Sequence, residues 1–385
     1  MAKHRWTLIG ESAEASQDVR IASQDIGSTS SNWSITKRTL SDGLSRGVDL
    51  VEIDNGRLRM AIIPTRGMGV WKAWKGDLEL GWKSPVRGPV HPAYVPFGEP
   101  SGLGWLDGFD ELMCRCGLFS NGAPDFDERG QLVHPLHGRI ANLPAHQSDL
   151  VVDDAEGTIS LSGVVDESRF HFHKLRLHST FTTRFESDAF SWHDEVENLS
   201  GSPTEMQMLY HTNIGTPLLE AGSVLKAPLR QVAPWDQASA DAGTANWHTF
   251  SEPELGFHEQ VYLLDLLADE AGHSEVLLKN AAGTSAVGLS FNIEQLPCFS
   301  LWRNLVPLAD GYVTGLEPAT NYPNPRSHET EQGRVAHLEP GARWKADLSL
   351  EWHTEPERLS AAEQRIDALQ GSHVPIVLDQ PQVEG

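Results

Sequence analysis

A histidine and a glutamate, far apart in the chain, are the residues whose types and settings best suit chemistry. His211 lies in the segment Met208-Leu-Tyr-His-Thr-Asn-Ile-Gly215, and Glu317 lies in Gly315-Leu-Glu-Pro-Ala-Thr-Asn321. Both follow strand-like sequence and run directly into turn residues. An imidazole with a pKa of about 6.5 can donate a proton at neutral pH, and a carboxylate can accept one. Two strands that deliver this pair to one cleft would supply the acid and the base for proton transfer at a sugar ring.

Three other segments carry polar side chains among turn residues. His134-Pro-Leu-His137-Gly-Arg139 brings two imidazoles and a guanidinium, Arg66 lies in a glycine-rich turn, and Trp302 is followed by Arg303. The indole of Trp302 is a candidate platform for the flat C–H face of a sugar. The arginines either pair with local carboxylates or bind an anionic sugar, and the sequence leaves both interpretations open.

The elements that must position these residues are mainly strands. Asn55-Gly56 between two apolar runs predicts a hairpin over residues 48–63, and the alternation from Leu175 to Phe185 predicts one face of a strand. Residues 356–369 carry a helical pattern, with Gly371 at the position of a C-cap. Many strands with little helical sequence predict an all-β fold, a large antiparallel β-sandwich with few short helices.

The sequence also suggests a domain organisation. We expect residues 1–35 to form an N-terminal extension that packs on the core. Residues 36–355 would form one β-sandwich domain, because no break in composition divides them. Residues 356–385 would form a C-terminal helix and tail.

Charge and cysteine content restrict the possible partners and the compartment. The chain of 385 residues has a formal net charge of -23, which argues against nucleic acid and anionic membrane surfaces as partners. Its three cysteines form no metal or disulfide pattern, as expected in a reducing cytoplasm. No apolar run is long enough to span a bilayer. We therefore expect a cytoplasmic protein, as a monomer or a homodimer.

The candidate segments resemble those of the aldose 1-epimerase, or galactose mutarotase-like, superfamily. Leu136-His137-Gly138 is similar to the segment that lies in the sugar cleft of that superfamily. His211 with Asn213 resembles the segment of its general acid, and Glu317 with the following Pro323-Asn324 resembles the loop of its general base. The turn at Arg66 and the Trp302 segment are similar to a divergent branch known only as a domain of unknown function related to aldose epimerases. The resemblance covers residues 45–352.

The resemblance implies an isomerase that opens and recloses a sugar hemiacetal without a cofactor or a metal. Glu317 would be the catalytic base, His211 the catalytic acid, and His137 would form a hydrogen bond to the ring oxygen. The sugar or sugar derivative, neutral or anionic, would meet seven substrate-binding residues: His137, Arg139, Arg66, Asn213, Trp302, Arg303 and Asn321. The same acid and base could also act at a carbon other than C1.

Two alternatives of other classes stay open. A carbohydrate-binding or sensing protein could keep the cleft and lack turnover. A metal-dependent sugar isomerase of the cupin type could use His171 and His173, which a continuous strand would place on one face. Elemental analysis would separate the second alternative from the others.

Overall fold

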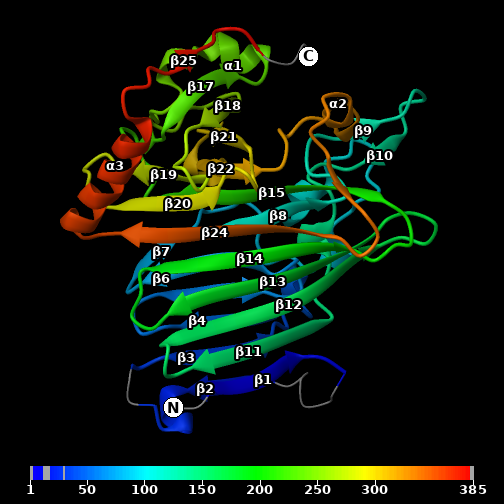
Figure 1. Cartoon of the computed structure of the whole chain (residues 1–385), viewed down its shortest axis with the longest axis vertical. Coiled ribbons are helices and arrows are strands. Elements are labelled where there is room, and N and C mark those ends of the chain that lie inside the picture. Colours follow the sequence, from blue (N-terminus) through cyan, green and yellow to red (C-terminus); the bar gives the residue numbers. More distant parts are fainter. Residues whose placement is uncertain (1–2, 12–17, 29–30, 382–385) are drawn as a thin grey trace. The chain divides into compact units, whose positions relative to one another are not determined.

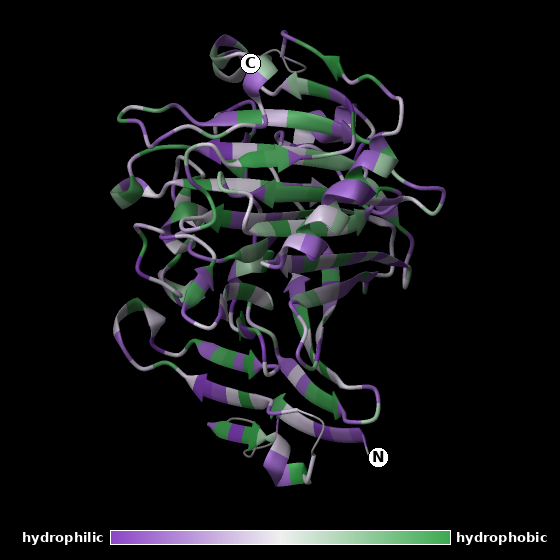
Figure 2. Cartoon of the chain, turned by 90° about the vertical axis from the view of Figure 1, so that its left-hand side faces the viewer, coloured by the Kyte–Doolittle hydropathy of each residue, from purple (hydrophilic) through white to green (hydrophobic). Residues whose placement is uncertain are grey.

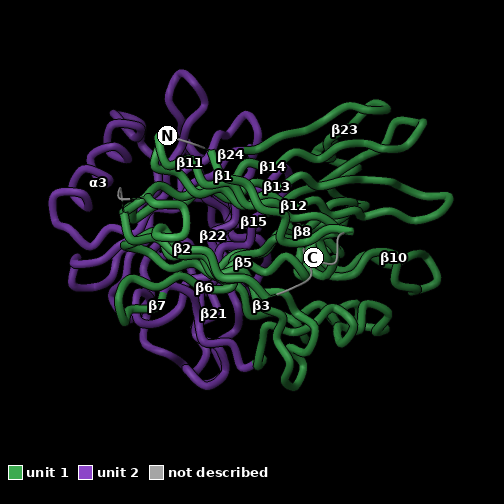
Figure 3. Tube along the Cα trace, turned by 90° about the horizontal axis from the view of Figure 1, so that it is seen from below, with its two compact units in different colours: residues 1–79, 86–209, 323–346 green, residues 80–85, 210–322, 347–385 purple. Residues whose placement is uncertain are grey.

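The computed structural model describes residues 3–11, 18–28 and 31–381, and these cluster into two compact units. Figure 3 shows them in green (residues 1–79, 86–209 and 323–346) and purple (residues 80–85, 210–322 and 347–385). Most of the described residues outside the loops are in strands, and three α-helices accompany them (Figure 1). This confirms the predicted all-β class.

Unit 1 is built from two sets of antiparallel strands. One set has the order β1-β11-β12-β13-β14, and the other has the order β2-β3-β4-β5-β6-β8. The elements that lie wholly or partly in this unit are β1 (Lys3–Ile9), β2 (Val19–Ala22), β3 (Ser34–Thr39), β4 (Asp49–Asp54), β5 (Arg59–Ile63), β6 (Gly69–Lys75), β7 (Leu78–Leu80), β8 (Met113–Leu118), β9 (Asp125–Phe126), β10 (Leu132–His134), β11 (Gln147–Asp153), β12 (Thr158–Ser168), β13 (Lys174–Arg184), β14 (Ala189–Asn198), β15 (Thr204–Gly215), α2 (Arg326–Glu331) and β23 (Ala336–Leu338).

Unit 2 also contains two sets of strands. Strands β24, β20, β19 and β16 form one antiparallel set, and β22, β21, β18 and β17 form the other, with β25 parallel to β17. Its elements are β16 (Val224–Lys226), β17 (Leu229–Pro234), α1 (Gln237–Ala242), β18 (Gln260–Leu266), β19 (His273–Lys279), β20 (Ala286–Asn292), β21 (Cys298–Asn304), β22 (Val313–Ala319), the greater part of β24 (Arg343–His353), α3 (Pro356–Gln370) and β25 (Ile376–Val377).

The local patterns in the sequence explain several of these elements. β4 and β5 pair as the predicted hairpin, in which Asn55 Oδ1 accepts hydrogen bonds from the backbone N–H groups of Arg57 and Leu58. β13 alternates between buried and half-buried residues, so the predicted strand face is confirmed. The same alternation of apolar and polar residues runs along the strands in Figure 2.

The predicted C-terminal helix is confirmed as α3, which ends before Gly371. Its apolar stripe of Leu359, Ala362 and Ile366 packs against Leu277 and Ala286 of unit 2. Removing such a stripe from water accounts for the docking of a helix whose remaining surface is polar.

Parts of the predicted terminal segments lie outside the described residues. From the first 35 residues, β1 pairs with β11 and β2 pairs with β3. The domain boundaries at residues 35 and 355 stay a prediction.

The metal-binding alternative rested on a strand that the structure does not contain. His171 and His173 lie in the turn between β12 and β13, where His171 has the left-handed φ of 69°. The prediction that the two imidazoles share a strand face was therefore wrong, because the chain reverses between Ser168 and Lys174. Across the described residues, no three His, Cys, Asp or Glu side chains group as metal ligands.

Candidate active site

One face of the β18–β21–β22 sheet in unit 2 carries the candidate chemistry. In the strand register Trp302 lies opposite Gly315, and Ser300 lies opposite Glu317. Because side chains alternate along a strand, these four residues share one face. The sheet therefore places Glu317 and Trp302 on the same surface, although fifteen positions separate them in the sequence.

His211, near the end of β15, reaches this face and contacts Glu317. Its Nε2 atom lies 3.2 Å from Oε1 of Glu317, and both side chains are nearly completely buried. Glu317 Oε1 nevertheless has no hydrogen-bond partner among the described residues, and neither has Oγ of Ser300. The two groups are thus close enough to exchange a proton, and Oε1 of Glu317 is able to accept a hydrogen bond from a substrate.

The side-chain amide of Asn213 determines which nitrogen of His211 carries a proton. Asn213 Nδ2 donates to the backbone carbonyl of His211 at 3.2 Å, so the amide oxygen is the atom directed at the ring. That oxygen lies 2.6 Å from Nδ1 of His211 and can only accept, which places a proton on Nδ1. The Nε2 atom that faces Glu317 therefore carries a proton only when the imidazole is positively charged.

Glu317 is an unusually basic carboxylate. Burial, and after it the negative charge of Glu259, raises the pKa of Glu317 to about 8. A carboxylate in an apolar, enclosed position prefers the neutral form because its charge has lost the solvation of water. Once deprotonated it is a stronger base than a solvated glutamate, as a group that accepts a proton from a sugar hydroxyl requires.

Trp302 lies beside the pair and is only partly buried. Its ring is 5.5 Å from that of His211, measured between centroids, at an interplanar angle of 73°. Its Nε1 donates a 2.8 Å hydrogen bond to Oε2 of Glu259. The partly exposed indole thus adjoins the buried His211–Glu317 pair.

Arg303 and Asn321, also predicted to bind substrate, lie in unit 2, and Arg303 points away from the His211–Glu317 pair. Arg303 follows Trp302 and so lies on the opposite face of β21. There its guanidinium donates 2.6 Å and 3.5 Å hydrogen bonds to the backbone carbonyls of Thr249 and Asn246. Asn321 accepts a hydrogen bond from Thr320 and donates one to the backbone carbonyl of Tyr322, which are its two neighbours in the chain.

His137, Arg139 and Arg66 belong to unit 1. His137 has a left-handed φ of 57°, and its Nδ1 donates to the backbone carbonyl of Asn121 at 3.0 Å. Burial lowers the pKa of His137 to about 4, so the ring is neutral at neutral pH. Because Nδ1 holds the proton, Nε2 of His137 is a hydrogen-bond acceptor. It can accept a hydrogen bond from a sugar hydroxyl but cannot donate one to a ring oxygen.

The two arginines of this group differ in burial. Arg66 is buried and donates to Glu111, Asn142 and the carbonyls of Val90 and Gly108. The guanidinium of Arg66 is therefore held by partners inside unit 1. Arg139 is exposed and lines a pocket of about 300 Å³ in the same unit, together with His134, Glu167, Arg169 and His173.

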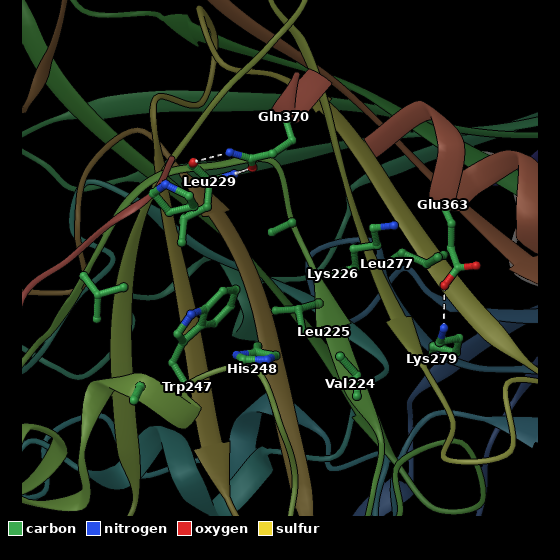
Figure 4. A pocket seen from close by; sticks show the side chains of 14 residues that line it. Val224, Leu225, Lys226, Leu229, Trp247, His248, Leu277, Lys279, Glu363 and Gln370 are labelled. Atoms are coloured by element: carbon green, nitrogen blue, oxygen red, sulfur yellow. Dashed lines mark hydrogen bonds and ion pairs between the residues drawn. The ribbon is translucent and has the colours of Figure 1, made fainter. Parts of the chain in front are cut away.

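A larger pocket, of about 590 Å³, lies in unit 2 and contains none of the predicted site residues (Figure 4). Leu225, Leu277 and Trp247 supply apolar walls, and Lys279 forms an ion pair with Glu363 at its rim. No ligand chemistry follows from this lining alone. Within residues 3–11, 18–28 and 31–381, no helix has the length and apolar character needed to cross a membrane.

Two residues of the site were not predicted from the sequence. Gly315 provides the space that lets Glu317 lean toward His211, and Glu259 holds the Trp302 indole. Gly315 lies two residues before the predicted base, so strand alternation could have placed it on the same face. Glu259 gave no such signal, because its position depends on the register between β18 and β21.

Comparisons with known proteins agree with the fold. A solved structure from Klebsiella pneumoniae subsp. pneumoniae MGH 78578, provisionally described as an aldose 1-epimerase, has a TM-score of 0.95 at 32% identity and covers 100% of both chains. A galactose mutarotase-like protein from Clostridium acetobutylicum has a TM-score of 0.56 at 14% identity, covering 83% of this chain and 98% of that one. Galactose 1-epimerase from Lactobacillus acidophilus NCFM has a TM-score of 0.55 at 12% identity, covering 83% of this chain and 98% of that one.

The fold is thus that of the galactose mutarotase-like β-sandwich proteins, and the predicted resemblance is confirmed. A family model described as a domain of unknown function (DUF4432) matches residues 45–352, which is most of the chain. The chain belongs to this family. No curated protein matches the sequence.

Proposed function

We propose that the protein is a cofactor-independent sugar epimerase that opens and recloses a cyclic hemiacetal at the face bearing His211 and Glu317. The observation that carries the proposal is the buried 3.2 Å contact between His211 Nε2 and Glu317 Oε1, beside the partly exposed Trp302. A titratable pair of this kind, with one strongly shifted pKa, is typical of acid–base catalysis. The similarity to aldose 1-epimerases supports the same chemistry.

In the proposed reaction, Glu317 Oε1 removes the proton of the anomeric hydroxyl. The imidazolium of His211 donates its Nε2 proton to the ring oxygen, the C1–O bond breaks, and an open-chain aldehyde forms. Rotation about C1–C2 and ring closure on the other face of the carbonyl give the second anomer. Closure returns one proton to His211 and takes one from Glu317, so the pair is regenerated without net proton release.

The hydrogen bond from His211 to Asn213 gives the acid its direction. The proton on Nδ1 of His211 stays there because it is hydrogen-bonded to Asn213 Oδ1. The proton that His211 donates to the substrate is therefore the one on Nε2. The neutral imidazole produced is already the tautomer that the amide stabilises. No rearrangement of the ring is needed between the two halves of the reaction.

Anomeric exchange measured by one-dimensional and saturation-transfer NMR tests the proposal. A panel of aldoses, uronates and sugar phosphates would be compared with and without the wild-type protein. At least one sugar is expected to exchange faster with protein present. Glu317→Gln and His211→Ala should each reduce that acceleration by about 10²–10⁴-fold, the usual contribution of an acid or a base.

Matched variants control for general damage. Glu294→Gln and His273→Ala change the same residue types at exposed positions in unit 2 and should leave the exchange rate unchanged. Full activity in either pair variant on a good substrate would contradict the assigned roles. Sugar binding without accelerated exchange by the wild-type protein would instead identify a carbohydrate-binding protein.

A further inference from the structure

Glu259 occupies a defined place in the sheet next to the proposed acid and base. In the register of β18 and β21, Val261 lies opposite Trp302. Glu259 precedes Val261 by two positions and is therefore the diagonal neighbour of Trp302 on the same sheet face. The 2.8 Å hydrogen bond from Trp302 Nε1 to Glu259 Oε2 joins these diagonal neighbours.

Two acidic side chains lie on this face of unit 2, and the exposed one is Glu259. Glu259 and Glu317 both lie there, and neither forms an ion pair with a lysine or an arginine among the described residues. Arg303, the nearest arginine in the sequence, projects from the opposite face of β21 toward the rings of Phe250 and Tyr262. A sugar lying on Trp302 would therefore meet the carboxylate of Glu259 on this side and no guanidinium from β21.

We propose that Glu259 is a positioning and specificity-determining residue, which holds the Trp302 indole beside His211 and selects neutral sugars over uronates and sugar phosphates. The inference rests on the proposed function and names the substrate class of that site. An anionic group near Glu259 would be repelled, because like charges in contact repel each other even in water. A neutral hydroxyl could instead donate a hydrogen bond to the carboxylate.

Glu259 also acts on the base. After burial, its negative charge is the second cause of the raised pKa of Glu317. The groups that face Glu317 are His211 from β15 and Glu259 from the segment before β18. Removing the charge of Glu259 should therefore lower the pKa of Glu317 and weaken it as a base, while burial keeps most of the shift.

Glu259→Gln is the decisive variant, because the amide oxygen can still accept the Trp302 hydrogen bond while the charge is lost. The ratio of kcat/KM for a neutral sugar to that for its uronate should fall by about threefold to tenfold at low ionic strength. Added salt should reduce the difference, because Glu259 is exposed and screened. The rising limb of the pH–rate profile should also move to lower pH. Glu254→Gln, in the same loop and also exposed, is the matched control and should change neither quantity.

Glu259→Ala removes both the charge and the acceptor for Nε1. Its KM for the neutral sugar should rise above that of Glu259→Gln, since the indole loses its anchor. Equal KM values in the two variants would show that the hydrogen bond does not position Trp302.

A measurement of stability keeps this inference separate from the proposed function. The pH at which Glu317 ionises in the folded protein can be read from the thermal stability of the wild type relative to Glu317→Gln. That midpoint should lie lower in the Glu259→Gln background. If the wild-type protein accelerates exchange but the ratio of kcat/KM for the neutral sugar to that for the uronate is unchanged in Glu259→Gln, the inference is overturned and the proposed function still holds. Absence of exchange with any sugar overturns both, and an unshifted midpoint overturns the electrostatic part by itself.

Discussion

Gly315 lies where any side chain would collide with the carboxylate of Glu317. A Cβ atom added at Gly315 would come within 2.3 Å of Oε1 of Glu317 and within 3.1 Å of Cε1 of His211. Contacts this short do not persist, so one of the two side chains would have to move. The space left by this glycine is what allows Glu317 on β22 and His211 on β15 to meet.

Gly315→Ala is therefore expected to disable the site with little effect on the fold. The methyl group should push Glu317 away from His211, and a displacement of about 1 Å can cost about 100-fold in rate. Anomeric exchange and the denaturant midpoint would be measured together. Gly98→Ala is the control, because a Cβ at that position meets nothing within 4 Å. Full exchange activity in Gly315→Ala would show that the contact seen here is not the reactive arrangement.

Glu317 should make the stability of the protein depend on pH. Its pKa is raised from 4.5 to about 8 in the folded state, so between these values the folded protein holds a proton that the unfolded chain has lost. Stability from this group is therefore complete below about pH 4.5 and is lost as the pH rises through about 8. Glu317→Gln, which stays neutral, should lose less stability than the wild type between pH 5 and pH 9.

Thermal denaturation across this pH range, in buffers of matched ionic strength, checks the expectation. The difference in melting temperature between Glu317→Gln and the wild type should grow in favour of the variant toward high pH. Glu294→Gln, at an exposed position, should follow the wild type. Parallel curves for Glu317→Gln and the wild type would mean that Glu317 ionises near its ordinary pKa.

We expect Asn213 to influence proton donation by His211, the proposed acid, without contacting the reacting atoms. Asn213→Ala removes the acceptor on Nδ1 of His211, so the neutral ring can hold its proton on Nε2 instead. We expect kcat to fall by roughly 10–100-fold, since a hydrogen bond to a charged group contributes about 1.5–3 kcal/mol. The pH–rate profile should change as well, which a purely structural role would not produce.

The neighbouring residue offers a control for that variant. Thr212 points to the other face of β15, and its hydroxyl has no hydrogen-bond partner among the described residues. Thr212→Val should therefore retain the wild-type rate and pH profile. Equal losses in Asn213→Ala and Thr212→Val would assign the effect to the strand and not to the amide.

Local patterns in the sequence predicted those elements that depend on local interactions. The Asn55-Gly56 hairpin and α3 follow from turn and capping residues a few positions apart, and the structure contains both. His171 and His173 show the limit of such patterns. Alternation could have continued through them, but the chain turns there, and no nearby residue marked the reversal.

The site depends on relationships that the sequence does not record. Trp302 and Arg303 were both expected at the substrate, yet adjacent positions on a strand face opposite sides, so only one of them can lie beside His211. That separation could have been derived from the period of a strand. The diagonal position of Glu259 could not, because the register of β18 against β21 is set by long-range packing.

Arg66 should prove to be a structural residue. Its guanidinium is buried and lies 2.5 Å from the carboxylate of Glu111, which is buried too. Arg66→Met would remove the guanidinium that pairs with this buried charge, and breaking a buried pair in this way costs about 3–5 kcal/mol. The denaturant midpoint should fall clearly in Arg66→Met and recover in part when Glu111→Leu is added, because the second change removes the buried negative charge. Arg139→Met, at an exposed position, should change stability little. If Arg66→Met instead kept its stability and lost affinity for the sugar, Arg66 would be a substrate ligand, as the sequence suggested.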